Sequence, residues 1–274
     1  TTRDTLQSEY GFSSKMIDRF FNPFFAGIFL EKELSTSRRM FDFVFKMFSQ
    51  ADTAIPALGM EEIPRQLAAA LPSKSIICNA KVDKIEQQTV WLSDGSSFTA
   101  PHIIIATQAT ALIQKIIKVK TKHQSTTHVH FTSDIPPIIA PLIALNSKKN
   151  RLVNNICVIN KVSSDYAPSD KNLISLSIVG TTEWTGKTLE KAIKKEMKTW
   201  FGNAVENWQY IDSRTVAYAL PDQSSVTHAI NPADRMIRKG LYQIGDFNSN
   251  GSINAAMREG RVVASHIVST LSNT

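Results

Sequence analysis

Residues 241–272 have the spacing of a ligand-binding corner. A short apolar run ends at Gly245-Asp246, a polar loop follows, and a helix is predicted from Gly251 onward. A strand, a turn and a helix in this order leave N–H groups of the first helical turn available to an electron-rich ligand. The Asp246 carboxylate can accept hydrogen bonds from sugar-type hydroxyls, and Gly251 lets a flat ligand approach the backbone closely. A packed corner in which Asp246 is only a cap explains the same spacing, so both interpretations stay open.

The predicted helix has a small and apolar face, because such residues recur at offsets of three, four and seven. Its N-terminus carries partial positive charge and favours negative charge on a ligand. We expect this face to be buried against a core; it comprises Ile253, Ala256, Met257, Gly260, Val263, Ala264 and Ile267.

No other motif specifies a reaction. The segment from Gly180 to Thr188 resembles a phosphate-binding loop, but five residues separate its glycines where that motif needs four. His128 and His130 fall on one face of a predicted strand without a third ligand nearby in sequence, so we expect an ordinary strand and no metal site. The sequence contains no GxSxG or HExxH pattern, which leaves a hydrolase unsupported.

Composition indicates a globular protein. Of 274 residues, 42% are hydrophobic and 20% are charged, which excludes disorder of the whole chain. The net charge is 31 − 24 = +7, but the lysine clusters are scattered, so we expect a solvated surface and no nucleic-acid partner. No apolar run reaches about 18 residues, the length at which a stretch becomes a candidate membrane-spanning helix. Cys78 and Cys157 lie far apart, which suits a reducing, cytoplasmic location, and the basic balance is compatible with peripheral contact with a membrane.

Predicted segments of two different kinds of domain alternate along the chain. Helices dominate residues 1–72, short strands residues 73–115, a mostly antiparallel sheet residues 116–235, and a strand and helix residues 236–274. The apolar run at residues 102–106 is typical of a strand that is buried on both faces of a parallel sheet. We therefore predict an α/β (α+β) fold, in which a partial parallel α/β domain is interleaved with an antiparallel-sheet domain that carries a helical cap. The expected strands are residues 75–78, 82–85, 89–92, 97–100, 127–132, 142–145, 152–160, 173–180 and 210–218, with a helix at residues 189–201.

Residues 20–30 are the most aromatic stretch, and we expect Pro23 to interrupt any helix there. An exposed cluster of this kind would promote aggregation, so it must face a core, a partner or an apolar ligand, and the core is favoured.

Three segments resemble the flavin-containing amine oxidase superfamily, which includes protoporphyrinogen oxidases and carotenoid desaturases. The pattern GD…GSINAAMREGRVVA is similar to the C-terminal flavin-binding motif of that family. Two further segments are similar to desaturase-like members: RFFNPFFAGIFLEKELSTSRRMF with IPALGMEEIPRQLAAALP, and NAKVDKIEQQTVWLSDGSSFTAPHIIIAT. The resemblance covers nearly the whole chain, and three motifs in the right order are more specific than one.

The resemblance implies a Rossmann-like FAD-binding domain and a substrate domain. Asp246 would hold a ribityl hydroxyl, the backbone after Gly251 would face the flavin, and the main chain of Val82 would meet the adenine. The flavin itself removes hydride from a hydrophobic substrate, so the resemblance implies no catalytic side chain. The residues implied to bind FAD are Val82, Ala106, Thr107, Gly245, Asp246, Gly251, Ser252 and Ile253, and those implied to line the substrate cavity are Phe24, Phe25, Gly59 and Met60.

Two departures limit the resemblance. The GxGxxG unit that seats the pyrophosphate does not occur in residues 1–274, so the sequence looks like the C-terminal portion of a longer protein whose N-terminal FAD-binding segment is the missing partner. Ser252 stands where monoamine oxidases place a tyrosine, which favours a bulky apolar substrate such as a polyene or tetrapyrrole over a simple amine. The alternative hypothesis is a cofactor-free binding module that retains the substrate domain.

Overall fold

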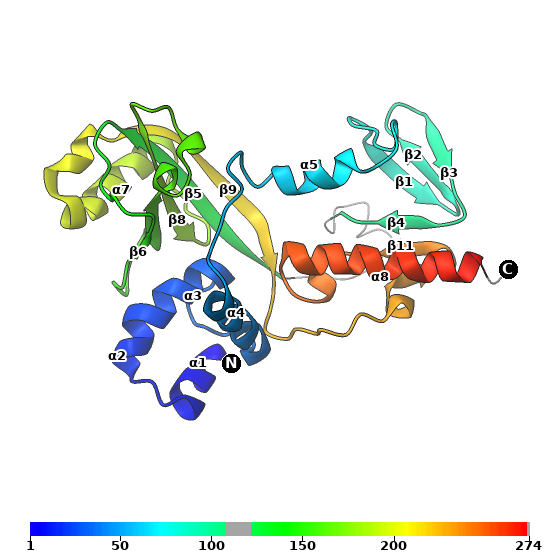
Figure 1. The fold of residues 1–274 in the computed structure, drawn as a ribbon, viewed down its shortest axis with the longest axis horizontal. Helices are drawn as coiled ribbons and strands as arrows, with labels where there is room; N and C mark the ends of the chain where they lie inside the picture. Colours follow the sequence, from blue (N-terminus) through cyan, green and yellow to red (C-terminus); the bar gives the residue numbers. More distant parts are fainter. Residues whose placement is uncertain (108–121, 273–274) are drawn as a thin grey trace. The chain divides into compact units, whose positions relative to one another are not determined.

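A computed structural model describes residues 1–107 and 122–272 (Figure 1). The chain folds into two units, each made from two separate stretches: unit 1 is Thr1–Leu67 with His123–Leu220, and unit 2 is Ala68–Lys122 with Pro221–Thr274. The boundaries lie at 67/68, 122/123 and 220/221, whereas the sequence placed them at 72/73, 115/116 and 235/236. The expected boundary at 115/116 lies outside the described residues.

Unit 1 begins with a helical region whose centre is aromatic. Phe25 is 0% exposed, and its ring lies 4.9 Å from that of Phe41 and 5.2 Å from that of Phe29. The prediction that this cluster faces a core is confirmed for Phe25. The helices are α1 (Thr2–Asp4), η1 (Thr5–Glu9), α2 (Ser14–Met16), η2 (Ile17–Phe21), α3 (Asn22–Phe29), α4 (Arg38–Gln50) and α5 (Glu62–Ala69), which crosses the boundary between the units.

The prediction that Pro23 interrupts the helix is wrong. Helical backbone continues through α2, η2 and α3, and Pro23 lies in the first turn of α3. The preceding segment η2 is a π-helix, in which the Asn22 N–H donates to the carbonyl of Ile17. The wider π-turn makes room where the proline ring would clash in a regular α-helix and where its missing N–H would break a bond.

The sheet of unit 1 has five strands in the order β6-β7-β8-β5-β9. The pairs β6/β7, β7/β8 and β5/β8 are antiparallel, which confirms the predicted arrangement. One face packs against α7 (Gly186–Phe201), where Phe131, Ile174 and Met197 are 0% exposed. The strands are β5 (His123–Ser133), β6 (Ile143–Leu145), β7 (Asn155–Val158), β8 (Asn172–Val179) and β9 (Gln209–Pro221); short 3-10 turns are η3 (Ile159–Lys161), η4 (Ser164–Tyr166) and η5 (Gly202–Asn207).

Unit 2 has three layers. A three-stranded antiparallel sheet is formed by β1 (Val82–Glu86), β2 (Thr89–Leu92) and β3 (Ser97–Thr99), and a second sheet has the order β10-β11-β4. Ile85 of β1 packs against Ile105 and Leu241 on one face of the second sheet. Helix α8 covers its other face, where Val263 and Ile267 meet Tyr242 and Ile244 (Figure 1). The remaining elements are β4 (Ile103–Ile105), β10 (Met236–Arg238), β11 (Leu241–Gln243), α8 (Ile253–Leu271), η6 (Pro232–Arg235) and η7 (Asp246–Asn248).

Strands β4 and β11 are parallel, as expected for a Rossmann-like sheet. The sequence predicted that the strand at residues 102–106 is buried on both faces. This prediction is wrong for Ile104 of β4, which is 38% exposed. Within the described residues β4 pairs only with β11 and forms the edge of its sheet, so one face lacks cover.

Two further predictions in unit 2 are wrong. Residues 75–78 form no strand, and Ile76 and Ile77 are more than half exposed, because no described strand lies beside them. The buried face of α8 is also rotated from the predicted one, since Ile253 and Met257 are about half exposed (51% and 47%). The residues buried in α8 are Ala255, Glu259, Val263 and Ile267. No helix in the described ranges is long and apolar enough to cross a membrane.

Candidate functional site

The candidate site lies in unit 2, where two parallel strands end side by side. The Ile244 N–H donates to the Ile105 carbonyl at 2.9 Å, so β4 and β11 remain paired up to their carboxyl ends. Ala106-Thr107 and Gly245-Asp246 follow these two ends directly. In open α/β sheets, ligands bind outside the carboxyl ends of the strands. The structure therefore brings the four residues to the edge where a ligand is expected.

Gly245, at the start of the turn after β11, leaves room for the ring of Phe247. A Cβ atom there would overlap this ring, so a larger residue would require the ring to move. The next residues form the short helix η7, in which the Ser249 N–H donates to the Asp246 carbonyl at 3.0 Å. Asp246 is half-buried at the beginning of this turn.

The N-terminus of α8 presents unbonded amides. Ser252 caps the helix, because its Oγ accepts from the Ala255 N–H at 3.0 Å, and the Gly251 N–H donates to Gln223 Oε1 at 3.0 Å. Within the described residues, the N–H groups of Ile253 and Asn254 have no acceptor. Free amides at the positive end of a helix dipole are suited to an electron-rich group. These amides are the donors that the sequence analysis expected at the corner, and the binding of a ligand there stays a prediction.

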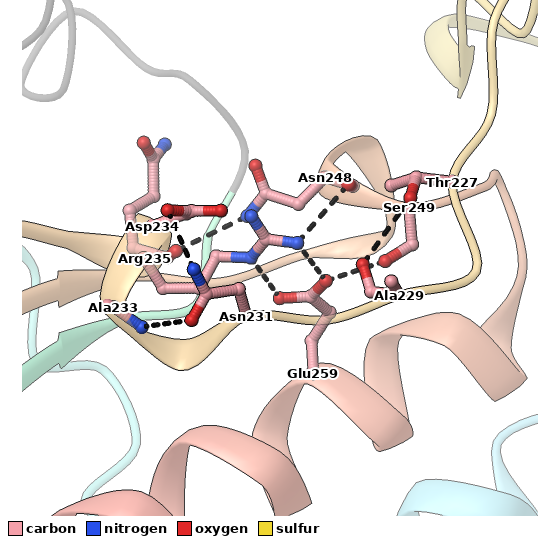
Figure 2. Close-up of polar contacts among 10 residues, drawn as sticks. Thr227, Ala229, Asn231, Ala233, Asp234, Arg235, Asn248, Ser249 and Glu259 are labelled. Atoms are coloured by element: carbon pink, nitrogen blue, oxygen red, sulfur yellow. Dashed lines mark hydrogen bonds and ion pairs between the residues drawn. The ribbon is translucent and has the colours of Figure 1, made fainter.

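A buried ion pair fixes this corner, and the sequence analysis missed it (Figure 2). Glu259 is 0% exposed, and Arg235 donates to both of its carboxylate oxygens at 2.7 Å, from Nε and from Nη2. The bond to Glu259 holds the pKa of Arg235 above its usual value. Asn231 caps the short helix η6 that carries Arg235, since its Oδ1 accepts from the Ala233 N–H at 3.3 Å.

The same pair holds the loop that contains the candidate ligand residues. Ser249 Oγ donates to Glu259 Oε1 at 2.6 Å, and Arg235 Nη2 also donates to the Asn248 carbonyl at 3.3 Å. Asn248 Nδ2 in turn donates to the carbonyl of Gln243 in β11 at 3.3 Å. Figure 2 shows Glu259 extending from α8 toward Arg235 with Ser249 beside it. We call Arg235, Asn248, Ser249 and Glu259 the clamp, because they join β11, the loop and α8.

One signal in the sequence could have revealed the clamp. Glu259 lies four residues from both Ala255 and Val263, so it occupies the buried stripe of α8. A carboxylate in such a stripe requires a partner, because an isolated buried charge is very unfavourable. The partner is 24 residues away in sequence and could not be identified from spacing.

The other residues implied by the resemblance are distributed over both units. Val82 lies half-buried in β1 of unit 2, paired with Leu92. In unit 1, Phe24 is half-buried, with its ring 5.6 Å from that of Phe20. Phe25 belongs to the aromatic core described above. Gly59 closes a turn through its N–H to the Pro56 carbonyl at 3.0 Å, and Met60 after it is 49% exposed.

The two histidines on β5 have separate partners. His130 Nδ1 lies 2.7 Å from Asp212 Oδ1, and His128 Nδ1 lies 3.3 Å from Ser177 Oγ. Burial, followed by the charge of His130, lowers the pKa of His128. Among residues 1–107 and 122–272, no three His, Cys, Asp or Glu side chains are arranged to hold a metal ion.

Comparisons with known proteins identify a family and similar folds. Residues 2–268 match one protein family, described as flavin containing amine oxidoreductase. The fold is similar to an oxidoreductase from Methanosarcina mazei, with a TM-score of 0.65 and 15% identity over 96% of this chain and 68% of that one. It is also similar to a candidate protoporphyrinogen oxidase from Exiguobacterium sp. 255-15, with a TM-score of 0.59 and 14% identity over 76% of this chain and 51% of that one.

A third similar structure is reduced UDP-galactopyranose mutase, with a TM-score of 0.61 and 12% identity over 94% of this chain and 66% of that one. At these identities the likeness concerns the fold. The chain thus spans between 51% and 68% of the length of the three proteins. No curated protein matches the sequence significantly.

Proposed function

The chain belongs to the flavin containing amine oxidoreductase family, and we propose that it supplies the substrate-binding and C-terminal FAD-binding parts of a flavin-dependent oxidoreductase. Its substrate would be hydrophobic and would lose a hydride. When bound, FAD supplies the hydride acceptor. The chain would orient the substrate and the cofactor and exclude water, and we assign no acid or base to it.

The observation that carries this proposal is the corner between β11 and α8. Asp246 would accept hydrogen bonds from ribityl hydroxyls, and the free amides of Ile253 and Asn254 would face the electron-rich part of the flavin. Ala106-Thr107, at the end of the neighbouring strand, would border the cofactor. These groups fit FAD because the carboxylate can accept hydrogen bonds from the ribityl hydroxyls, while the unbonded amides at the positive end of the helix can donate to the flavin.

We further propose that a dinucleotide-binding βαβ unit outside residues 1–274 completes the cofactor site. No GxGxxG pattern occurs in the sequence, so the pyrophosphate requires another source of glycine-rich backbone. Two apolar surfaces of unit 2 support the addition of such a unit. Ile104 is 38% exposed on the edge strand β4, and the outer face of α8 exposes Ile253, Met257 and Val268.

Two features support the substrate assignment, one in each unit taken by itself. Its aromatic helices and its antiparallel sheet would form the substrate domain, in which Phe24, Gly59 and Met60 would border the bound molecule. Ser252 places a small hydroxyl, and no aromatic ring, at the N-terminus of α8. A small side chain there favours a bulky apolar substrate over a simple amine.

Replacement of Asp246 tests the cofactor proposal. In the full-length protein, Asp246→Ala should lower the amount of FAD that copurifies, measured by visible flavin absorbance per polypeptide. Asp83→Ala, which removes an exposed carboxylate from β1 in the same unit, should leave FAD occupancy unchanged. Equal occupancy in both variants and the wild type would refute the role of Asp246.

A cofactor-free binding module is the second candidate, and the missing GxGxxG pattern favours it. Full-length protein that binds apolar molecules but never acquires flavin would support this candidate. It differs from the first in that Asp246→Ala would then leave ligand binding unchanged.

A further inference from the structure

Unit 1 contains a polar cavity that the proposed flavin chemistry does not use. Its volume is about 650 Å³, which lies in the range of small-molecule sites. A smaller cavity of about 290 Å³ shares Lys32 and Arg151 with it. The charged side chains that line the larger cavity are Arg3, Lys32, Lys149 and Arg151 against Asp18 and Glu33, so cations are in excess.

Arg151 is a buried cation without a carboxylate partner. It is 8% exposed, and its Nε and Nη2 donate to Asn154 Oδ1 and Asn22 Oδ1, each at 2.9 Å. Its Nη1 donates to the Lys148 carbonyl at 3.2 Å. All three acceptors are neutral, and two of the five guanidinium N–H groups have no acceptor among the described residues. Burial lowers the pKa of Arg151, and the charge of Glu196 opposes this shift only in part.

Two of the nearby carboxylates have other partners: Glu196 accepts from the N–H groups of Leu152 and Val153, and Asp18 Oδ1 lies 3.5 Å from Arg3 Nη1. The third, Glu33, lines the cavity and forms no ion pair among the described residues. Within the described residues, neither Lys32 nor Lys149 forms an ion pair. Among the described residues, Arg151, Lys32 and Lys149 therefore form no ion pair, although the charge of Glu196 acts on Arg151 from nearby.

The fold holds the guanidinium in place. Asn154 Nδ2 donates to the carbonyl of Pro23 at 2.9 Å, which ties the end of β7 to α3. This close approach depends on Gly27, since a Cβ atom there would lie 3.0 Å from Asn154 Nδ2. A fixed guanidinium with free N–H groups matches the two oxygens of a phosphate or carboxylate group.

We propose that this cavity binds the phosphate group of a small anionic molecule, with Arg151 as the directional donor and Lys32 and Lys149 as additional cations. The ligand would neutralise Arg151 as a carboxylate does in an ordinary buried ion pair. This inference does not rest on the proposed flavin function, because none of the lining residues is among those assigned to the cofactor or the substrate.

The test measures the binding of inorganic pyrophosphate to the full chain by titration calorimetry at constant ionic strength. Lys32→Gln/Lys149→Gln should weaken binding at least tenfold. The control Lys191→Gln/Lys195→Gln removes the same charge from the exposed face of α7 and should bind like the wild type. Arg151→Lys, which keeps the charge but loses the planar fork, should also weaken binding at least tenfold.

Two results would overturn the proposal: absence of pyrophosphate binding to the wild type, and equal weakening in the two lysine double variants. If pyrophosphate does not bind but the protein sediments with phosphatidic acid vesicles, the surface is assigned to a lipid headgroup instead of a small molecule. The lysine variants keep the test valid if Arg151→Lys fails to fold.

Discussion

Each unit contains an arginine whose side chain is largely buried, and the two have different hydrogen-bond partners. Arg235 in unit 2 has a side chain that is 11% exposed and donates twice to Glu259, whose oxygens also serve Ser249. Arg151 in unit 1 is 8% exposed and donates only to neutral oxygens beside a cavity. Arg235 is neutralised by Glu259 within the protein, whereas Arg151 donates to no carboxylate and lines a cavity in which cations are in excess.

The comparison separates a structural role from a ligand-binding role. A buried ion pair costs desolvation energy, so a pair that is complete serves chiefly to fix geometry. The clamp fixes the loop that carries Asp246 and Ser252 in this way. A buried cation that is held in place but not neutralised is suited to an external anion.

Breaking the clamp should have the largest effect. Glu259→Leu leaves Arg235 buried without a counter-ion and should lower the free energy of unfolding of unit 2 by about 3–5 kcal/mol. The matched control Glu190→Gln disrupts a partly exposed helix pair with Lys194 at 3.0 Å and should cost at most about 0.5 kcal/mol. Urea denaturation of both variants measures the difference. Similar losses in the two would contradict the structural role of the clamp.

Replacement of Arg151 should lower the free energy of unfolding by less than Glu259→Leu does. Arg151→Met leaves the oxygens of Asn22 and Asn154 without a donor but removes an uncompensated charge, so unfolding should become easier by about 1–2 kcal/mol. The variant should also lose any stabilisation by pyrophosphate. Urea denaturation with and without pyrophosphate checks both effects. A loss as large as that of Glu259→Leu would show that the two arginines have the same role.

The two cysteines can report on the units separately. Cys157 lies in β7 of unit 1, where burial raises the pKa of its thiol to about 11, whereas Cys78 in unit 2 is exposed. Near neutral pH a thiol-specific reagent should label Cys78 at least about a hundredfold faster, because only the thiolate reacts. The single-thiol variants Cys78→Ser and Cys157→Ser isolate each rate. Fast labelling of Cys157 in the native protein would contradict its burial.

Lowering the pH should have the smallest effect on stability among these tests, and the effect should concern unit 1. The pKa of His128 is lowered in the folded state by burial and by the charge of His130, so the unfolded chain binds a proton first as the pH falls. His128 therefore leaves stability unchanged above its unfolded pKa of about 6.5 and reduces it as the pH falls further. His128→Gln should flatten the dependence of the urea midpoint on pH in this window. An unchanged slope would contradict the prediction.

Local patterns were predictable from the sequence, and long-range pairings were not. The turn between β2 and β3 and the corner at Gly245 were predictable because both depend on the types and spacing of residues that lie close together in the sequence. The Asn22–Arg151 contact joins residues 129 apart, and the inward turn of Glu259 depends on Arg235, so neither could be read from a single segment. Pro23 shows the same limit, because the preceding π-turn, which no periodicity indicated, accommodates it.

The most direct test of the central claim is the flavin content of the full-length protein. The purified protein, supplied with FAD during refolding or expression, should carry one flavin per chain and show visible flavin absorbance. Colourless full-length protein that does not bind added FAD would contradict the assignment of the β11–α8 corner to a flavin.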